Sequence, residues 1–236
     1  MPSIDVCFSP ELLPLYDLKG KIAVAVDVLR ATSSMVTALA HGVSHIAPVS
    51  DLQECLAFRE KGYLVAAERD GIKADGFDFG NSPFHYREGV EGKRLAITTT
   101  NGTQAIRLSR AADEVLVGAF VNVGAVARYV RAKGKDVVVV CAGWKGLFNL
   151  EDTLFAGALA ERLQADFHLN HDATLAAYHL YQTAKTDLLG FLSKSSHVQR
   201  LERLHILPDI EFCLQEDVYQ LVPVLQGEVL VPAELG

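Results

Sequence analysis

Four short segments of the sequence place carboxylate, guanidinium, amide and hydroxyl groups directly behind apolar runs. In the first segment, VAVDVLRATSS, Asp27 ends an apolar run and is followed by Arg30 and Thr32. An aspartate at such a place can bind a metal ion or act as a nucleophile, and an arginine offers a planar set of N–H donors to phosphate or sulfonate. An Asp–Arg ion pair with ordinary helix capping is the simpler alternative.

The second segment, AAERDGIKADGFDFGNSP, is a long loop rich in charge and glycine that contains Glu68, Arg69, Asp78, Asn81 and Ser82. Loops of this length are usually functional or disordered. Its two phenylalanines favour a loop that packs against the protein. A solvated surface loop is the alternative.

The third segment, LAITTTNGTQAI, crowds small polar residues where an apolar run meets a helical pattern. We expect the N–H and hydroxyl groups of Thr100, Asn101, Gly102 and Thr103 to converge at the positive end of that helix and to bind an oxyanion. Plain N-capping by Asn101 is the alternative.

The fourth segment, VVVVCAGWKGLFNLEDTLFAGAL, contains Gly143 after a strongly apolar run, and Glu151 and Asp152 at a predicted helix start. Paired carboxylates of this kind can bind Mg²⁺, or they can stabilise the helix dipole. No histidine stands in a recognisable motif beside Cys141, so we interpret Cys141 as a buried structural thiol and the histidines as surface or packing residues.

The elements that must position these groups alternate along the chain. Six short apolar runs predict strands that are covered on both faces, and the segments between them have helical spacing. This pattern indicates an α/β fold with three layers, α/β/α, around a mostly parallel or mixed sheet. Strands are expected at 21–28, 45–49, 63–68, 93–99, 113–119 and 135–143, and helices at 33–41, 51–61, 101–111, 122–132 and 151–163.

From about residue 165 the strand signal fades and helical spacing prevails over residues 170–205. We expect a helix at 171–184, and a final helix and an edge strand within 209–225. Residues 1–236 are interpreted as one domain. Because open α/β sheets bind ligands at the carboxyl ends of their strands, the four segments predict one site there.

Composition limits the partners of the protein. The 236 residues include 22 Lys and Arg against 29 Asp and Glu, a net charge of −7, which gives no general attraction to nucleic acids or acidic membranes. An anionic ligand therefore needs a local basic pocket. The start of the chain has no signal-peptide pattern, and we expect a cytoplasmic protein. The apolar tail VYQLVPVL makes a homodimer reasonable.

Taken together and in this order, the motifs resemble the 2-phosphosulfolactate phosphatase family. The resemblance rests on DVLRAT, ER followed by Gly71, GFDFGNSP, TTTNGT, CAG, LEDTLFAG and the C-terminal DIEFCLQEDVYQLVP, and thus spans nearly the whole chain. It implies a Mg²⁺-dependent enzyme that hydrolyses 2-phospho-3-sulfolactate to 3-sulfolactate and phosphate, a step of the coenzyme M biosynthesis type.

The resemblance implies metal-binding, catalytic and substrate-binding residues within the four segments. We predict a metal-binding set drawn from the carboxylates, with two or three of them in contact with the ion: Asp27, Glu68, Asp78, Glu151 and Asp152. Catalytic roles are expected for Asp27, Arg30, Glu68, Arg69 and Asn101. Substrate contacts are expected from Thr32, Asn81, Ser82, Thr100, Gly102, Thr103 and Gly143.

Two questions stay open at the level of sequence. The nucleophile is either Asp27 or a metal-activated water. The ligand is either phosphosulfolactate or another small phosphorylated hydroxy acid, and a non-catalytic binder of phosphate or sulfonate metabolites would share the anion-binding groups.

Overall fold

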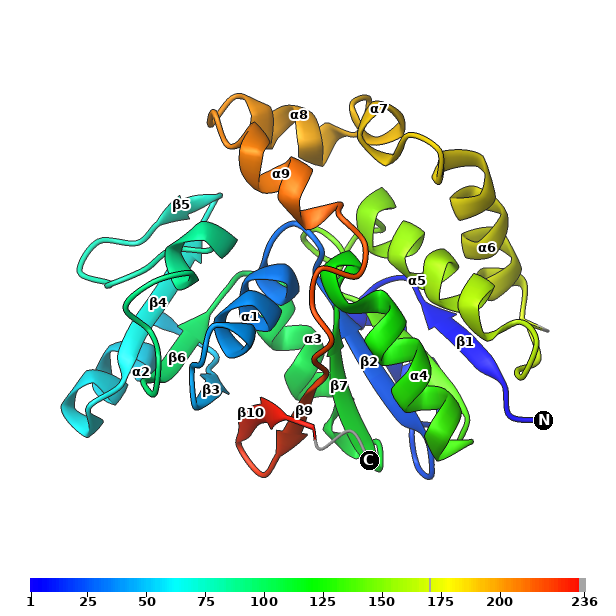
Figure 1. The fold of residues 1–236 in the computed structure, drawn as a ribbon, viewed down its shortest axis with the longest axis horizontal. Helices are drawn as coiled ribbons and strands as arrows, with labels where there is room; N and C mark the ends of the chain where they lie inside the picture. Colours follow the sequence, from blue (N-terminus) through cyan, green and yellow to red (C-terminus); the bar gives the residue numbers. More distant parts are fainter. Residues whose placement is uncertain (170, 234–236) are drawn as a thin grey trace.

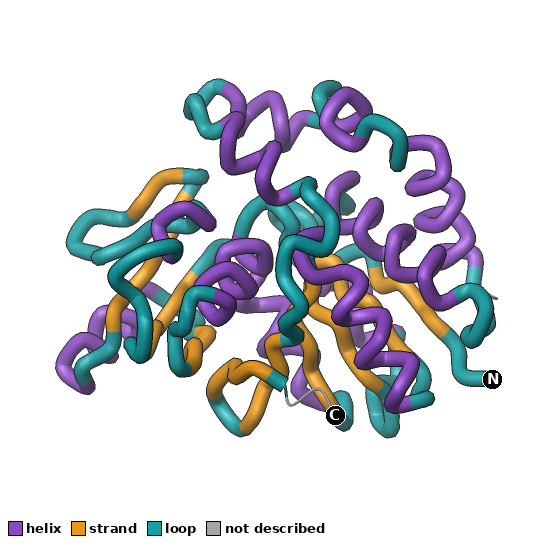
Figure 2. Tube along the Cα trace, in the orientation of Figure 1, coloured by secondary structure: helices purple, strands orange, loops and turns teal. Residues whose placement is uncertain are grey.

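The computed structural model describes residues 1–169 and 171–233. Within them, ten strands form one mixed sheet in the order β1-β8-β2-β7-β9-β10-β3-β6-β4-β5, with helices packed against it (Figures 1 and 2). This confirms the predicted α/β class. The strands are β1 (Ile4–Cys7), β2 (Ile22–Val26), β3 (His45–Pro48), β4 (Leu64–Arg69), β5 (Ile72–Lys73), β6 (Arg94–Thr98), β7 (Glu114–Gly118), β8 (Val137–Cys141), β9 (Pro223–Gln226) and β10 (Val229–Pro232).

Two parallel groups of strands make up most of the sheet. One group is β1, β8, β2 and β7, and the other is β3, β6 and β4. The C-terminal hairpin β9–β10 joins them through antiparallel pairs with β7 and β3. Our prediction of an edge strand in the tail is therefore wrong. A hairpin needs only a tight turn, so it can fill the gap between two groups whose own strands are connected through helices.

The helices agree with the predicted ones in place and differ at their ends. They are α1 (Ala31–Ala40), α2 (Leu52–Ala57), α3 (Gly102–Leu108), α4 (Val123–Lys133), α5 (Leu150–Leu163), α6 (Asp172–Ala184), α7 (Leu188–Leu192), α8 (Ser196–Glu202) and α9 (Leu207–Cys213). The helices α2 and α3 are shorter than expected because their last turns tighten into 3₁₀ form. Helices prevail after residue 165, as predicted, although residue 170 lies outside the described part.

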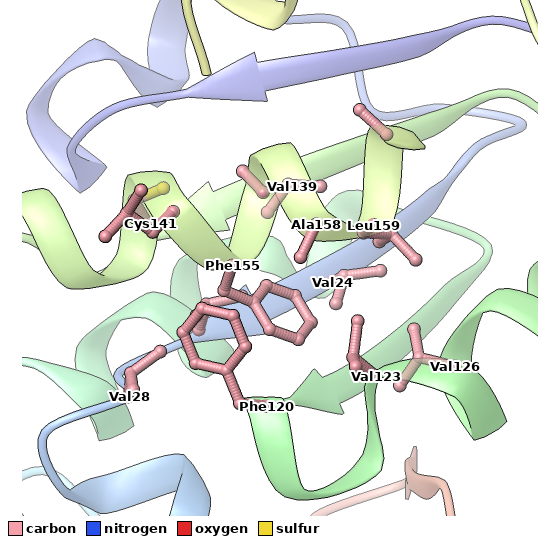
Figure 3. Packing of buried hydrophobic residues seen from close by; sticks show 14 of the residues in the cluster. Val24, Val28, Phe120, Val123, Val126, Val139, Cys141, Phe155, Ala158 and Leu159 are labelled. Carbon is pink, nitrogen blue, oxygen red and sulfur yellow. The ribbon is translucent and has the colours of Figure 1, made fainter. Parts of the chain in front are cut away.

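Both faces of the central strands are covered, which explains the continuously apolar runs. In β2, Ile22, Val24 and Val26 pack in a cluster with α4, α5 and α6, whereas Ala23 and Ala25 belong to a second cluster with α1 and α3. Figure 3 shows side chains of the first cluster from β2, β8, α4 and α5 gathered between strands and helices. The predicted three layers thus arise from burial on two sides.

The apolar tail is only partly internal. Val222 is fully buried and Val224 is 8% exposed, because this segment leads into and forms β9, whereas Val218 at its start is 41% exposed. The fold of one chain thus explains part of the apolar character of the tail, and the homodimer stays a prediction. Within the described residues, none of the helices combines the length and the apolar character that a transmembrane span requires.

The carboxyl ends of β2, β4, β6 and β8 converge although they belong to two groups. Residues that follow each of these strands line one pocket, and α8 contributes further side chains to it. In Figure 1, α7, α8 and α9 arch over this end of the sheet. The four polar segments of the sequence are therefore brought to a common region.

Candidate active site

A small pocket lies where the four strand exits meet α8. It contains about 300 Å³ of space, counting the part open to solvent. The lining residues are Asp27, Leu29, Arg30, Glu68, Gly71, Asn81, Asn101, Trp144, His197, Arg200 and Leu201.

Asp27 directly follows β2, and hydrogen bonds between its backbone and the Thr32 hydroxyl fix its position. The Thr32 hydroxyl accepts a hydrogen bond from the Asp27 N–H (3.1 Å) and donates one to the Asp27 carbonyl oxygen (2.9 Å). A β-carbon on Gly102 would lie 2.8 Å from Oδ2 of Asp27, so only glycine lets α3 approach this carboxylate. Thr32, predicted to contact substrate, is fully buried and positions Asp27 instead.

Burial changes the acidity of Asp27, whose exposed fraction is 8%. The pKa of its carboxyl group is raised to about 6, with desolvation as the largest cause; nearby His197 lowers this pKa, and the carboxylates of Glu68 and Glu151 add to the increase. Perturbed acids in a pocket are frequent at functional sites. Burial and pocket position together make Asp27 a candidate for a chemical role.

Asp152, at the start of α5, ties two strand exits together. Its Oδ1 accepts from the Val28 N–H (2.8 Å), and its Oδ2 accepts from the Gly143 N–H (3.2 Å) and from Nδ2 of Asn149 (2.9 Å). Burial, followed by the charges of Asp27 and Glu151, raises its pKa well above the usual range. Both oxygens are already engaged, so the structure gives the predicted metal ligand Asp152 a structural role. Gly143, predicted to contact substrate, serves as one of its donors.

Glu151 carries the feature that points most directly to a missing positive charge. It is fully buried, and its Oε1 accepts hydrogen bonds from Nδ1 of His197 and from Nδ2 of Asn149 (3.1 Å). Its Oε2 is buried and has no hydrogen-bond partner among the described residues. A buried carboxylate oxygen in this state requires a proton or a cation for compensation.

His197 lines the pocket and is a candidate functional residue that sequence reasoning missed. It lies on α8, 46 residues after Glu151, in a segment that shows only helical spacing. Its ring also stacks on Trp144, with centroids 5.2 Å apart. No local motif links this histidine to its carboxylate, since the contact arises from tertiary packing alone.

Arg30 reaches the pocket but already has partners. Its guanidinium donates to the buried carboxylate of Asp209 on α9 and to the Gly71 carbonyl oxygen (2.8 Å). The predicted role as a free phosphate-binding arginine therefore needs revision. The simpler alternative of a pair with Asp27 is also wrong, because the partner is Asp209, distant in sequence.

Glu68 and Arg69 point to different places because successive strand residues alternate in direction. Glu68 lines the pocket and accepts a hydrogen bond from the Gly71 N–H. Arg69 donates to the Glu68 carbonyl oxygen (2.6 Å) and to Oγ1 of Thr98 (3.3 Å), outside the pocket lining. The expected catalytic role of Arg69 has no geometric support here.

The polar residues that follow β6 line two different hollows. Asn101 lines the pocket, and its side chain makes no capping hydrogen bond to α3. Thr99 takes that place, because its Oγ1 accepts from the Thr103 N–H (3.2 Å). Thr100 and Thr103 line a separate hollow that includes Arg107, so the expected single oxyanion cradle is wrong for these two threonines.

The loop after β4 contributes only part of its predicted residues. Asn81 lines the pocket, and its Oδ1 is buried without a partner among the described residues. Ser82 is buried next to it but is not part of the lining. Asp78 lies elsewhere: it pairs with Arg59 (3.0 Å) and accepts from the Val65 N–H (2.9 Å). The predicted metal-binding role of Asp78 therefore has no geometric support, because the residue lies outside the pocket lining.

The carboxylates in and beside the pocket are of the type that a hard cation accepts as ligands. Over the described residues, no three His, Cys, Asp or Glu side chains form a ready metal-binding group. Mg²⁺ commonly uses only one or two protein carboxylates and keeps several waters. Asp27 lines the pocket, whereas Glu151 lies outside the lining and has a buried Oε2 without a hydrogen-bond partner among the described residues. A magnesium site at these residues stays a prediction.

The raised pKa of Asp27 predicts a stability effect in metal-free protein. The pKa of Asp27 is about 6 in the folded protein and lower in the unfolded chain, so ionisation of this carboxyl group favours unfolding. The penalty on folding is complete above about pH 6 and disappears as the pH falls to the pKa of the unfolded chain. We expect Asp27→Asn to raise the free energy of unfolding by about 1–3 kcal/mol near pH 7.5, and by much less near pH 4. Urea unfolding in EDTA measures this.

Asp166→Asn is the control for that experiment. Asp166 pairs with Arg131 at the surface (2.6 Å), where such pairs contribute about 0–1 kcal/mol. If Asp27→Asn destabilises the metal-free protein near pH 7.5, the account of a strained buried carboxylate is wrong.

Comparison with known proteins agrees with the motifs. The 2-phosphosulpholactate phosphatase family matches residues 7–228. A protein of Caldanaerobacter subterraneus subsp. tengcongensis named probable 2-phosphosulfolactate phosphatase is 42% identical over 221 residues, 91% of either chain. Relatives with the same name in Gloeobacter violaceus (44% over 227 residues; 93% of this chain, 94% of the relative) and Thermotoga maritima (40% over 224; 94% and 97%) are similarly close. The chain therefore belongs to the 2-phosphosulpholactate phosphatase family.

Proposed function

We propose that the protein is a Mg²⁺-dependent phosphatase that hydrolyses 2-phospho-3-sulfolactate to 3-sulfolactate and phosphate. The names of its relatives support the substrate. The observation that carries the proposal for this chain is the pocket itself, where the carboxylate of Asp27 faces amide and guanidinium groups in a small space. This combination suits a compact anion whose charge must be offset locally in an acidic protein.

Asp27 and Glu151 would hold the Mg²⁺, with Glu68 near enough to influence the charge of Asp27. When bound, the ion supplies Lewis-acid stabilisation of phosphoryl oxygens and lowers the pKa of a bound water. The chain itself supplies orientation. Asn149 and His197 fix the Glu151 carboxylate through hydrogen bonds to Oε1, which leaves Oε2 for the cation.

The amides of Asn81 and Asn101 are placed to bind the phosphate. Both line the pocket, and Asn101 is not used for capping. Neutral donors of this kind stabilise negative charge that develops on equatorial oxygens. Arg30 lines the same space, but its charge is already paired with that of Asp209.

His197 is placed to handle the proton of the leaving group. Its Nδ1 faces Glu151, and its Nε2 makes no hydrogen bond with the described residues. In the hydrolysis, the bond between phosphorus and the lactate oxygen breaks, and that oxygen must take up a proton. His197 can deliver it from Nε2 when the ring carries a proton on both nitrogens. The new P–O bond comes from water or from the Asp27 carboxylate, and the proton that the water loses restores the imidazolium.

The stereochemical course at phosphorus distinguishes the two nucleophiles. Attack by the Asp27 carboxylate forms an aspartyl-phosphate that water then opens at phosphorus, and these two in-line displacements give net retention with an isotopically chiral phosphate ester. A single in-line attack by water gives inversion. The released sulfolactate fits a coenzyme M biosynthesis-type step in the cytoplasm, which forms part of this proposal.

Phosphate release tests the proposed function directly. We expect the protein to release phosphate from 2-phospho-3-sulfolactate when Mg²⁺ is present, and EDTA to stop the reaction until Mg²⁺ is restored. Phosphoglycolate and 2-phospholactate serve as competing substrates. Tight binding of phosphosulfolactate without any phosphate release would show a binding protein and contradict the proposal.

Asn101 and Thr99 form a matched pair of variants at one junction. Asn101→Ala should lower kcat/KM by about 10²–10³-fold, the usual effect of losing a transition-state donor, and leave stability nearly unchanged because Asn101 does not cap α3. Thr99→Val should cost about 1 kcal/mol of stability through the lost bond to the Thr103 N–H and largely retain activity. Equal loss of stability and activity in Asn101→Ala would contradict its role.

A further inference from the structure

Arg200 differs from the other arginines near the pocket in having no partner for its charge. Arg30 is paired with Asp209, and Arg69 points to Thr98. Arg200 lines the pocket, yet no carboxylate of the described residues lies within 4.0 Å of it, and its buried Nε has no hydrogen-bond partner among them. Leaving a buried guanidinium N–H unsatisfied is costly, so this position is suited to an acceptor from outside the chain.

The guanidinium of Arg200 packs over the face of the Trp144 ring. Its Cζ lies 4.0 Å from the centroid of the Trp144 ring. Its Nη1 lies near Gly71: a β-carbon built on Gly71 would be 3.9 Å from this nitrogen. With one face covered by the indole, the guanidinium is left to bind through its N–H edge, which matches two oxygens of a carboxylate or sulfonate.

Arg200 lies about one helical turn after His197, the histidine proposed to protonate the leaving group. Both are on α8, three residues apart, which corresponds to a rise of about 4.5 Å. Charged substituents on neighbouring carbons of a three-carbon acid are separated by a similar distance. Both side chains line the same small pocket, so an ester that reacts beside His197 can bring a neighbouring anionic group near Arg200.

We propose that Arg200 is a specificity-determining residue that binds a second oxyanion of the substrate, a sulfonate or carboxylate that does not react. This inference rests on the proposed function and deepens it. It explains how an acidic protein selects a multiply charged substrate: the reacting phosphate is bound at Asp27 and its cation, and the non-reacting anion is bound at Arg200 against Trp144.

The test compares three phosphate esters in wild-type protein, Arg200→Gln and Arg200→Lys. They are 2-phospho-3-sulfolactate, 2-phospholactate without the sulfonate, and glycerol 2-phosphate without either anion. Arg200→Gln should lower kcat/KM for phosphosulfolactate by at least about 30-fold and leave glycerol 2-phosphate within about threefold. Arg200→Lys should fall between, because lysine keeps the charge and loses the planar geometry.

Arg203→Gln is the matched control, since Arg203 directly follows α8, is exposed, and loses the same charge. It should leave all three esters unchanged. A large loss for 2-phospholactate in Arg200→Gln would assign the carboxylate to Arg200, and a loss for phosphosulfolactate alone would assign the sulfonate. An equal loss for all three esters with normal circular dichroism would overturn the assignment.

Binding of 3-sulfolactate separates this inference from the proposed function. Calorimetry with the product needs no turnover, and we expect Arg200→Gln to weaken its binding by at least about tenfold relative to Arg203→Gln. If wild-type protein binds sulfolactate through Arg200 but releases no phosphate, the proposed function fails and the assignment stands. If it releases phosphate while Arg200→Gln binds sulfolactate normally, the assignment fails and the function stands.

Discussion

Buried negative charge is the constraint on which this structure depends. Besides burial, the charge of Glu151 raises the pKa of Asp27, and the charges of Asp27 and Glu151 raise the pKa of Asp152, inside a chain whose net charge is already −7. Charges removed from water must be paired or hydrogen-bonded. The donors around them follow from that need: backbone N–H groups serve Asp152, an amide and an imidazole serve Glu151, and Asp27 together with the remaining oxygen of Glu151 is left for a ligand.

The fold meets this constraint by bringing distant segments to one place. The two parallel groups of strands are held together by the C-terminal hairpin, and their exits converge under α8 and α9. Asp209 on α9 pairs with Arg30, and His197 on α8 forms a hydrogen bond with the buried carboxylate of Glu151. The C-terminal helices thus complete the electrostatics of the pocket as well as covering the strand ends.

Much of this could be predicted from local patterns. The six central strands are continuously apolar, the helices between them are periodic, and Asp27, Glu68, Asn81 and Asn101 stand at strand exits, where an open α/β sheet places its ligand. The rest depends on tertiary contacts. His197, Arg200 and Asp209 lie on helices without a motif, and Asp78 sits in a motif but points to Arg59. Thr100 and Thr103 share a segment with Asn101 but line another hollow.

Calorimetric titration of the metal-free protein with Mg²⁺ tests the central claim most directly. The account predicts one ion per chain, with an affinity that falls by at least about tenfold in Asp27→Asn and in Glu151→Gln and stays unchanged in Asp78→Asn. Mg²⁺ binding that survives both pocket substitutions, or that disappears with Asp78→Asn alone, would contradict it.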